Sequence, residues 1–346
     1  MANPFRLGFL THVEGAGDPQ QIYRETLELF VAADALGFEV GWVAQHHFDK
    51  AGRLPSPFPL LAAAAERTQR IHLGTAVVVL PFENPIRLAE DAAVLDMLSG
   101  GRLELGLGSG ADPAEFQAFG LDVERRRELT TDGLHALQGI LSGAPLGASG
   151  LRLHPPAPGL NQRLWQSVYS APGAQYAARH GVGLLINRAV YDSDAPSDQL
   201  QAPWASAYLA AWDGQLAKPR IGLSRGVYPA ADKRTALAEL REGVTRFADT
   251  MIALGRFPAG QSIERYAQRL HIAYGHPEEV ADGLRADRVL PYTTDLILQF
   301  NPAVPPLDQA MRQLEQIATQ IAPALGWRPG ATSDVDIGQP LGTGLR

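Results

Sequence analysis

The sequence predicts an α/β fold, a single (β/α)8 barrel with insertions in the loops after the fourth and sixth strands. Eight short apolar runs alternate with longer segments of helical periodicity, which is the pattern of a parallel sheet covered by helices. No change in composition separates the two halves of the 346 residues, so one closed barrel is favoured over two lobes. An open, doubly wound sheet is the alternative.

The first half of the chain supplies four expected strands. Ile71–Leu80 is nearly all apolar and β-branched, as expected for a strand that is buried on both faces. The other three strands are expected at Arg6–Leu10, Gly41–Phe48 and Leu103–Leu107. The helices are expected at Pro19–Leu36, Pro57–Arg67, Pro85–Leu98, Pro113–Phe119 and Val123–Leu141.

The second half supplies four more strands and two insertions. The strands are expected at Leu164–Tyr169, Gly183–Asn187, Arg220–Val227 and Asp295–Phe300. The helices are expected at Pro172–His180, Pro203–Leu216, Asp232–Leu254, Pro277–Leu284 and Leu307–Leu325. The irregular segments are Ser142–Pro158, a surface insertion, Tyr191–Gln201, a polar candidate lid, and Gly255–Tyr266. Residues 1–327 are therefore expected to form one domain, with a polar tail over 328–346.

Composition excludes several classes of function. The net charge of −7 provides no electrostatic footprint for nucleic acid or an anionic membrane. The chain has no cysteine, which excludes disulfides, a cysteine-ligated zinc site and a cysteine nucleophile together. The N-terminus lacks the pattern of a signal peptide, and no segment approaches about 18 uncharged apolar residues, so a cytoplasmic location is expected.

Two adjacent histidines, His46 and His47, end the second expected strand and precede a loop rich in Gly and Pro at Ala51–Pro59. Neighbouring side chains of a strand point to opposite faces, so one histidine is expected to face a ligand while the other packs or meets solvent. In a barrel the C-terminal ends of the strands form the working face, and the pair falls there. A strand-end histidine bonded to a backbone carbonyl is the alternative.

Two turns offer backbone groups to a ligand. Gly106–Ala111 fits the pattern G-x-G-x-x-G/A, but three βα units precede it, whereas a dinucleotide fingerprint normally opens its fold. A glycine-rich turn that lets the backbone approach a planar ligand explains it as well. At Ser170, the hydroxyl and the N–H groups of Ala171, Gly173 and Ala174 would meet an anion at a helix N-terminus, or the serine is an ordinary cap.

The remaining titratable residues give weaker signals. Glu90, Asp91 and Asp96 share a helix outside the barrel, far from its mouth, and are expected to form salt bridges. His12 follows the first strand and is either a substrate contact or a loop histidine. No histidine has the partner spacing of a metal site, so no metal is expected.

Several stretches form an ordered set of motifs. They are Leu36–Phe38 through Gln45–Phe48, Ile71–Val77, Asn84–Asp91 and Leu95–Leu103. Taken together they resemble the luciferase-like flavin monooxygenases, the family of the bacterial luciferase α chain and of flavin- or deazaflavin-dependent relatives. The similarity is densest over residues 5–130, resumes at Ser170–Gly181 and is thin afterwards.

This resemblance implies a (β/α)8, or TIM, barrel with a reduced flavin across its mouth. It also implies a non-proline cis peptide at Ala76–Val77, which forms a bulge behind the flavin ring. His46 takes the place of the catalytic histidine, Ser170 that of the phosphate-binding serine, and His47 is expected to be structural. The residues expected to bind the cofactor are Ala76, Val77, Gly108, Ser109, Ser170, Ala171 and Gly173.

The activity implied is a monooxygenation of an aldehyde, ketone or similar small organic substrate by O2. The cofactor is reduced FMN from a separate flavin reductase, and the enzyme is expected to be a homodimer. His46 would act as general acid or base near neutral pH. The alternatives are a reductase or dehydrogenase that passes hydride with the deazaflavin F420, and a flavin-binding protein without turnover.

The sequence departs from the family pattern at two places. The family commonly has Glu before the two histidines, whereas Gln45 stands here, which removes a charge and a possible base. The luciferase turn after the fourth strand has Cys and then a phosphate-binding Arg, whereas Gly108 and Ser109 stand here. The phosphate is then left to backbone groups, Ser109 and Ser170.

Overall fold

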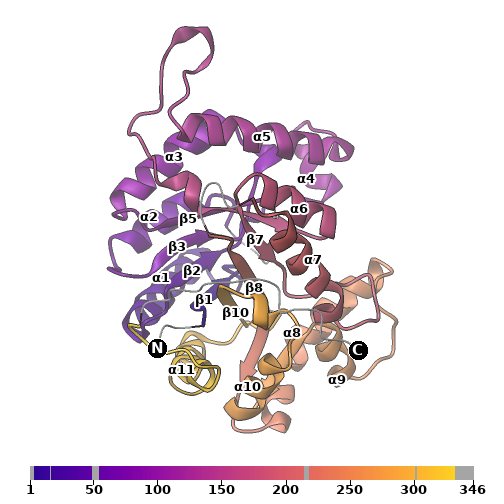
Figure 1. The fold of residues 1–346 in the computed structure, drawn as a ribbon. Helices are drawn as coiled ribbons and strands as arrows, with labels where there is room; N and C mark the ends of the chain where they lie inside the picture. The colour runs from indigo at the N-terminus through magenta and orange to yellow at the C-terminus, as the bar shows by residue number, and fades with distance from the viewer. Residues whose placement is uncertain (1–3, 16, 49–53, 214–217, 301, 332–346) are drawn as a thin grey trace. The chain divides into compact units, whose positions relative to one another are not determined.

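The structure is a computed structural model that describes residues 4–15, 17–48, 54–213, 218–300 and 302–331 (Figure 1). The chain forms two compact units. The N-terminal unit consists of Gly8–Ser167 and Val304–Leu314, and the C-terminal unit of Met1–Leu7, Val168–Ala303 and Glu315–Arg346. Residues 51–53 of the expected loop, the end of the helix expected to reach Leu216, and residues 332–346 of the expected tail lie outside the described residues.

Parallel strands form the sheet of the N-terminal unit. They are β1 (Arg6–Thr11), β2 (Val40–Val43), β3 (His72–Thr75), β4 (Val78–Val79), β5 (Leu103–Gly108) and β6 (Leu164–Val168). From Gly8 onward β1 pairs with β2, which pairs with β3, and β5 pairs with β3, β4 and β6. The order of the strands along the sheet therefore follows their order in the chain, as repeated βα units require.

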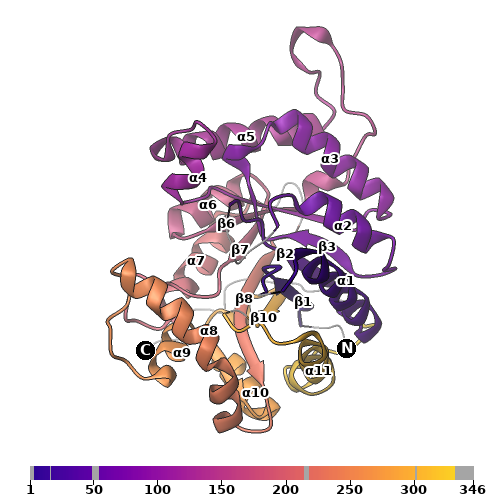
Figure 2. The ribbon, with the colours of Figure 1, turned by 180° about the vertical axis from the view of Figure 1, so that it is seen from behind.

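Helices alternate with these strands as the sequence predicts. They are α1 (Pro19–Leu36), α2 (Pro57–Ala65), α3 (Pro85–Leu98), α4 (Pro113–Ala118) and α5 (Arg126–Leu141). Helix α1 ends at Gly37, which has a φ of 88° and closes the last turn, and Asn84 caps α3 by accepting from two backbone N–H groups. Figure 2 shows α1 and α2 beside β1, β2 and β3.

The two faces of this sheet are packed differently. On the side of α1, a Cβ on Gly41 would lie 2.4 Å from Cε1 of Phe30, so the helix sits directly on strand β2. On the opposite face, a Cβ on Gly74 would lie 2.3 Å from Cε3 of Trp42. The Trp42 and Trp165 rings meet edge to face there, with centroids 5.7 Å apart. Glycines thus leave room for large aromatic side chains in the interior of the sheet.

The C-terminal unit is built around one long strand. Strand β8 (Ile221–Pro229) is buried over its whole length and pairs in parallel with three others, which are β7 (Gly183–Ile186), β9 (Ile272–Gly275) and β10 (Asp295–Gln299). The helices are α6 (Ala171–Arg179), α7 (Ser197–Ala211), α8 (Lys233–Ala253), α9 (Ile263–Arg269) and α10 (Pro277–Arg285). After β10, the chain forms α11 (Leu307–Gln316), whose residues up to Leu314 belong to the N-terminal unit, and it then continues through a π-helical turn at Ile317–Ile321 into α12 (Ala322–Ala324).

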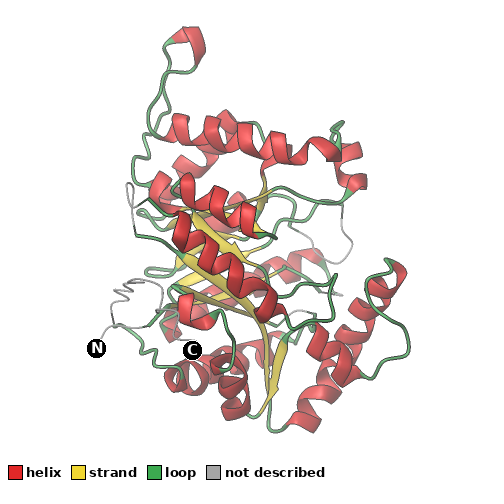
Figure 3. Cartoon of the chain, turned by 45° about the vertical axis from the view of Figure 1, so that its right-hand side comes forward, coloured by secondary structure: helices red, strands yellow, loops and turns green. Residues whose placement is uncertain are grey.

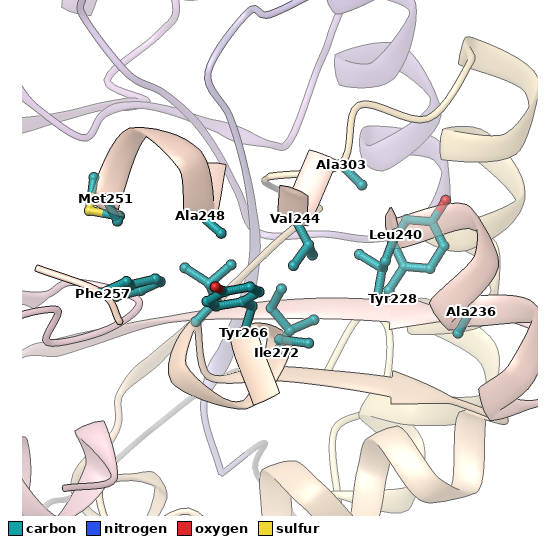
Figure 4. Packing of buried hydrophobic residues seen from close by; sticks show 12 residues of the cluster. Tyr228, Ala236, Leu240, Val244, Ala248, Met251, Phe257, Tyr266, Ile272 and Ala303 are labelled. Carbon is teal, nitrogen blue, oxygen red and sulfur yellow. The ribbon is translucent and has the colours of Figure 1, made fainter. Parts of the chain in front are cut away.

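A separate hydrophobic cluster holds α8, α9 and β9 together (Figure 4). Leu240 and Val244 of α8, Tyr266 of α9 and Ile272 of β9 are buried in it, and Tyr228 joins it from β8. The segment expected to be irregular, Gly255–Tyr266, is irregular up to Ser262, and its last four residues open α9. Strand β9 was not expected from the sequence. These short elements are stabilised by the shared cluster rather than by local periodicity.

Three other boundaries differ from the sequence-based expectation. Strand β2 ends at Val43 and not at Phe48, so both histidines lie in the following loop. The strand expected at Ile71–Leu80 is interrupted between β3 and β4. Helix α7 begins at Ser197, and Pro203, which was expected to open it, lies inside it. Proline is frequent in the first helical turn, and that rule misplaced the start.

The two expected insertions behave differently. Ser142–Pro158 projects from the end of α5, with an isolated antiparallel bridge between Leu146 and Leu151 (Figures 1 and 3). In Tyr191–Gln201, Tyr191 packs against the ring of Phe247 of α8, and Arg269 of α9 forms an ion pair with Asp194. This segment is therefore attached to α8 and α9.

Candidate active site

The histidine pair lies in a loop whose backbone is bonded on two sides. Ala44 N–H donates to Thr11 O at 3.1 Å, which places the end of β2 beside the end of β1. His46 N–H donates to Leu54 O at 3.1 Å, which closes the loop. Both histidine side chains are half-buried. Because both histidines lie in a loop, the alternation of side chains along a strand does not decide where they point. The two rings nevertheless have different neighbours.

His46 contacts a second histidine. Its Nε2 lies 3.1 Å from Nδ1 of His12, at hydrogen-bond distance, and the two rings stack with centroids 5.4 Å apart and an interplanar angle of 23°. Glu14 Oε1 lies 4.0 Å from the same Nδ1 atom. The structure thus brings His12 to His46, a contact that neither sequence-based interpretation of His12 included.

His47 is enclosed by aromatic side chains. Phe82 and Phe119 meet its ring edge to face at centroid distances of 5.5 and 4.9 Å. Its Nε2 is buried without a hydrogen-bond partner in the described part of the chain, and its backbone N–H donates to Glu115 Oε1 at 3.3 Å. Burial, and then the charge of His46, lower the pKa of His47. These contacts support a structural role for a neutral His47.

A bulge separates β3 from β4 beside this loop. The Ala76–Val77 peptide bond is cis, as the resemblance implies, and Ala76 N–H donates to Val43 O at 2.8 Å. Both bulge residues are half-buried. A Cβ on Gly108 would lie 2.3 Å from Cγ2 of Val77, a distance that real Cβ atoms do not reach. The structure thus brings together the end of β2, the bulge and the end of β5.

The turn after β5 continues from Gly108. Ser109 is half-buried, and its hydroxyl lies 3.4 Å from Gly110 O, while Gly110 has a φ of 64° that favours glycine. Asp112 then caps α4 by accepting from Ala114 N–H at 2.8 Å. The glycine motif therefore forms a tight turn into a short helix next to the bulge.

Gln45 has a structural role that explains its departure from the family pattern. Its side chain is buried, and Oε1 accepts from Val79 N–H at 2.7 Å. Its Nε2 donates to Pro55 O at 3.0 Å and to Glu83 Oε1 at 3.3 Å. Burial raises the pKa of Glu83 against the lowering effect of this hydrogen bond. An amide can both accept from Val79 and donate to Glu83 at this position, whereas an ionised carboxylate can only accept.

Ser170 lies in the C-terminal unit, at the N-terminus of α6. Its hydroxyl accepts from Gly173 N–H at 3.3 Å, and its carbonyl accepts from Ala174 N–H at 3.0 Å. Of the three amides expected to meet an anion, the N–H groups of Gly173 and Ala174 thus already have acceptors. Ser170 itself is exposed, and Ala171, at the first helical position, is half-buried.

The acids of α3 pair as expected, with one difference. Arg87 binds Glu90 and Asp91 on the exposed face of the helix. Asp96 is instead buried and accepts from Arg163 at 2.6 Å, so it links α3 to the start of β6. Within the described ranges, no group of three or more His, Asp or Glu side chains is arranged to hold a metal ion.

The chain forms a (β/α)8 barrel in which the end of the strand before the histidine pair is bonded to a cis-peptide bulge. The sequence of residues 5–300 matches the model of the luciferase-like monooxygenases. The chain is also 32% identical over 300 residues to 4-hydroxyprotoasukamycin monooxygenase of Streptomyces nodosus subsp. asukaensis, which covers 80% of each chain. The chain therefore belongs to the luciferase-like monooxygenase family.

Other relatives and solved structures agree with this assignment. The oxygenase component of flavin-dependent trigonelline monooxygenase of Acinetobacter baylyi is 27% identical over 252 residues, 68% of each chain. Monooxygenase RslO1 of Streptomyces bottropensis matches with a TM-score of 0.76 and 25% identity over 93% of this chain and 100% of that one. The 3,6-diketocamphane monooxygenase of Pseudomonas putida, solved with FMN, shares the fold at a TM-score of 0.75 and 18% identity, covering 92% of this chain and 98% of that one.

None of the helices in the described ranges is long and apolar enough to cross a membrane.

Proposed function

We propose that the protein is the oxygenase component of a two-component monooxygenase. It binds reduced FMN delivered by a separate flavin reductase, and it uses O2 to oxidise an aldehyde, ketone or similar small organic substrate. The observation that carries this proposal is the half-buried His46 in the loop that follows β2, next to the bulge at Ala76–Val77. The trigonelline monooxygenase relative, itself described as an oxygenase component, supports the two-component arrangement.

The bulge fits the ring of a flavin. Ala76 and Val77 offer a half-buried apolar surface between β2 and β5, and Gly108 has no side chain that would cover it. An apolar surface of this kind suits a flat aromatic ring, and it also excludes water from the reacting atoms. When bound, the reduced flavin supplies the electrons for the activation of O2.

His46 is the general acid or base of this proposal. Histidine ordinarily titrates near neutral pH, so it can both hold and release a proton under physiological conditions. The hydrogen bond to His12 orients the ring of His46, and the hydrogen bond from the backbone N–H of His46 to Leu54 O holds the loop that carries it. His46 thus holds a proton at a defined place beside the bulge.

The N-terminus of α6 is proposed to hold the phosphate of the cofactor. Ser170 supplies a hydroxyl, and the first-turn backbone, including Ala171, supplies the positive end of the helix dipole. A Cβ on Gly173 would lie 3.3 Å from the Ser170 hydroxyl, so glycine keeps that oxygen in place. These groups would take the part that the resemblance assigns to an arginine in luciferase.

The test combines binding with oxygen consumption. The protein is titrated with FMN and with the deazaflavin, and oxygen uptake is then followed with reduced FMN and a panel of aldehydes and ketones. We expect FMN binding and substrate-dependent oxygen uptake. His46→Ala is expected to lower turnover at least about 100-fold while FMN affinity changes less than about threefold. His135→Ala, an exposed position on α5, is the matched control.

Other results would reject parts of the proposal. Preference for the deazaflavin without oxygen uptake would indicate a hydride-transferring enzyme, and equal oxygenation rates in His46→Ala would exclude the catalytic role of His46. Ser170→Ala is expected to weaken FMN binding about 5- to 20-fold while riboflavin, which lacks the phosphate, binds equally well to both proteins. A parallel loss for riboflavin would exclude the phosphate role.

We also propose that the protein is a cytoplasmic homodimer that associates through α3. Its outer face exposes Val94, Met97 and Leu98, at 47, 62 and 54% of their surface. Such a row of apolar side chains is unusual on the surface of a monomer. Met97→Glu is expected to convert a dimer to a monomer in light-scattering measurements, and a wild-type monomer would exclude this proposal.

A further inference from the structure

The contact between His12 and His46 involves two specific nitrogen atoms. Nδ1 of His12 and Nε2 of His46 lie 3.1 Å apart. A neutral imidazole has one N–H and one bare nitrogen, so one of the two atoms must donate and the other must accept. The direction of this bond decides where His46 carries its own proton.

The backbone between His12 and Glu14 has an unusual conformation. Val13 has a φ of 54°, which β-branched residues rarely adopt, and its side chain is 1% exposed. Its N–H donates to the hydroxyl of Thr11 at 3.1 Å, which helps to hold the turn. Residues kept in such conformations cluster at functional sites. In this turn, Glu14 lies close to the ring of His12.

The position of Glu14 selects the direction of the hydrogen bond. Its Oε1 lies 4.0 Å from Nδ1 of His12, and both side chains are mostly buried, at 18 and 24% exposure. A carboxylate at this distance favours a proton on the nitrogen that faces it. Nδ1 of His12 therefore donates, Nε2 of His46 accepts, and the remaining proton of His46 is on Nδ1.

We propose that His12 and Glu14 are positioning residues that hold neutral His46 in the tautomer with its proton on Nδ1. The consequence for catalysis rests on the function proposed above, whereas the tautomer itself does not. Among the described residues, His47 also lies beside His46, and burial is the first cause that lowers the pKa of His47. Glu14 is the carboxylate recorded beside the His12 ring in this part of the chain.

The tautomer can be measured on the protein without cofactor. Protein labelled with nitrogen-15 in its nine histidines is studied by long-range proton–nitrogen NMR at about pH 8, and His46 is assigned with His46→Gln. In the wild type, we expect the Nδ1–H form of His46 to dominate. In His12→Gln, which removes the donor from this position, the ratio is expected to move about tenfold toward Nε2–H, the form that a histidine side chain free in water prefers.

Two further variants separate the roles of the donor and the charge. Glu14→Gln is expected to shift the ratio about fivefold in the same direction, because it removes one charge at about 4 Å. His12→Asn keeps an N–H donor near the Nδ1 position and is expected to preserve most of the wild-type preference. Glu28→Gln on α1 and His135→Gln on α5, both exposed, are matched controls that should leave the ratio unchanged.

Two outcomes would overturn the inference. One is an Nε2–H His46 in the wild-type protein, and the other is a ratio that does not respond to His12→Gln. Oxygen uptake tests the proposed function independently of the tautomer. Its absence in the wild type would reject the proposed function but would not contradict the inferred tautomer. If both proposals hold, His12→Gln lowers kcat more than KM and His12→Asn restores part of the rate, which a merely structural histidine would not do.

Discussion

Replacing Gln45 by Glu, the residue common in the family at this place, is expected to destabilise this protein. The carboxylate still accepts from Val79 N–H, but it loses the two bonds that Nε2 donates to Pro55 O and Glu83, at about 1 kcal/mol each. It also faces the half-buried Glu83 carboxylate, and the repulsion between the two charges adds about 1 kcal/mol to the loss of stability. The free energy of unfolding should therefore fall by about 2–3 kcal/mol at pH 8.

The loss should depend on pH in a defined direction. Two carboxyl groups that share a site titrate with at least one raised pKa in the folded state, so their contribution is favourable at low pH and is lost as the pH rises from about 4 to about 7. At pH 5 the cost of Gln45→Glu should shrink to about 1 kcal/mol, because a protonated carboxyl donates again. Urea unfolding at both pH values, followed by tryptophan fluorescence, measures the difference.

A second substitution tests the assigned cause. Glu83→Gln in the Gln45→Glu background restores a donor and removes the repulsion, and it should recover at least about 1 kcal/mol at pH 8. An exposed acid on α1, changed as Glu28→Gln, should recover nothing. Equal losses at pH 5 and pH 8, or no recovery by Glu83→Gln, would refute the pairing argument.

Two further predictions concern substitutions at strands, one in the C-terminal unit and one in the N-terminal unit. Arg225 and Asp287 form an ion pair at 2.6 Å that is almost fully buried, and Asp287→Asn should cost about 3–5 kcal/mol in urea unfolding at pH 7. Burial raises the pKa of Asp287, but the hydrogen bond with His271 and the charge of Arg225 lower it far more, so this stability should persist above about pH 4 and be lost below it. Gly108→Ala should cost about 1–3 kcal/mol and weaken FMN binding, whereas Gly139→Ala, in open space on α5, should stabilise the protein by about 0.5–1 kcal/mol.

Local sequence patterns predicted the bounds of the helices that have capping residues at their own ends. Helix α3 has Asn84 as its cap, Pro85 at its first position and glycines at 100 and 101 after its end, and its predicted bounds are confirmed. The same holds for α1 and its stop at Gly37. Interactions within one turn of the chain decide these boundaries, so the sequence alone contains them.

The candidate site depends on contacts between segments that are distant in the sequence, and local sequence patterns did not predict these contacts. The apolar run of β2 shows no reason to stop at Val43, but Ala44 bonds back to Thr11 and His46 to Leu54 across the loop. Nothing near His12 in the sequence predicts its contact with His46. The one local clue was the short spacing from His12 to Glu14, whose meaning depends on the positive φ of Val13. The cis bond at Ala76–Val77 was predicted only from the family resemblance.

Gln45 and Glu14 together explain how the histidine site can work without the usual carboxylate. A carboxylate at position 45 would compete with Glu83 and would leave the Pro55 carbonyl without its donor, so the amide is required by its own neighbours. A charge that acts on His46 must then come from another segment. In the arrangement proposed above, Glu14 supplies it through His12, on the loop after β1 rather than on the loop after β2. The departure at Gln45 and the unusual turn at Val13 are therefore two parts of one arrangement, and substituting Glu14 should affect His46 more than substituting Gln45 does.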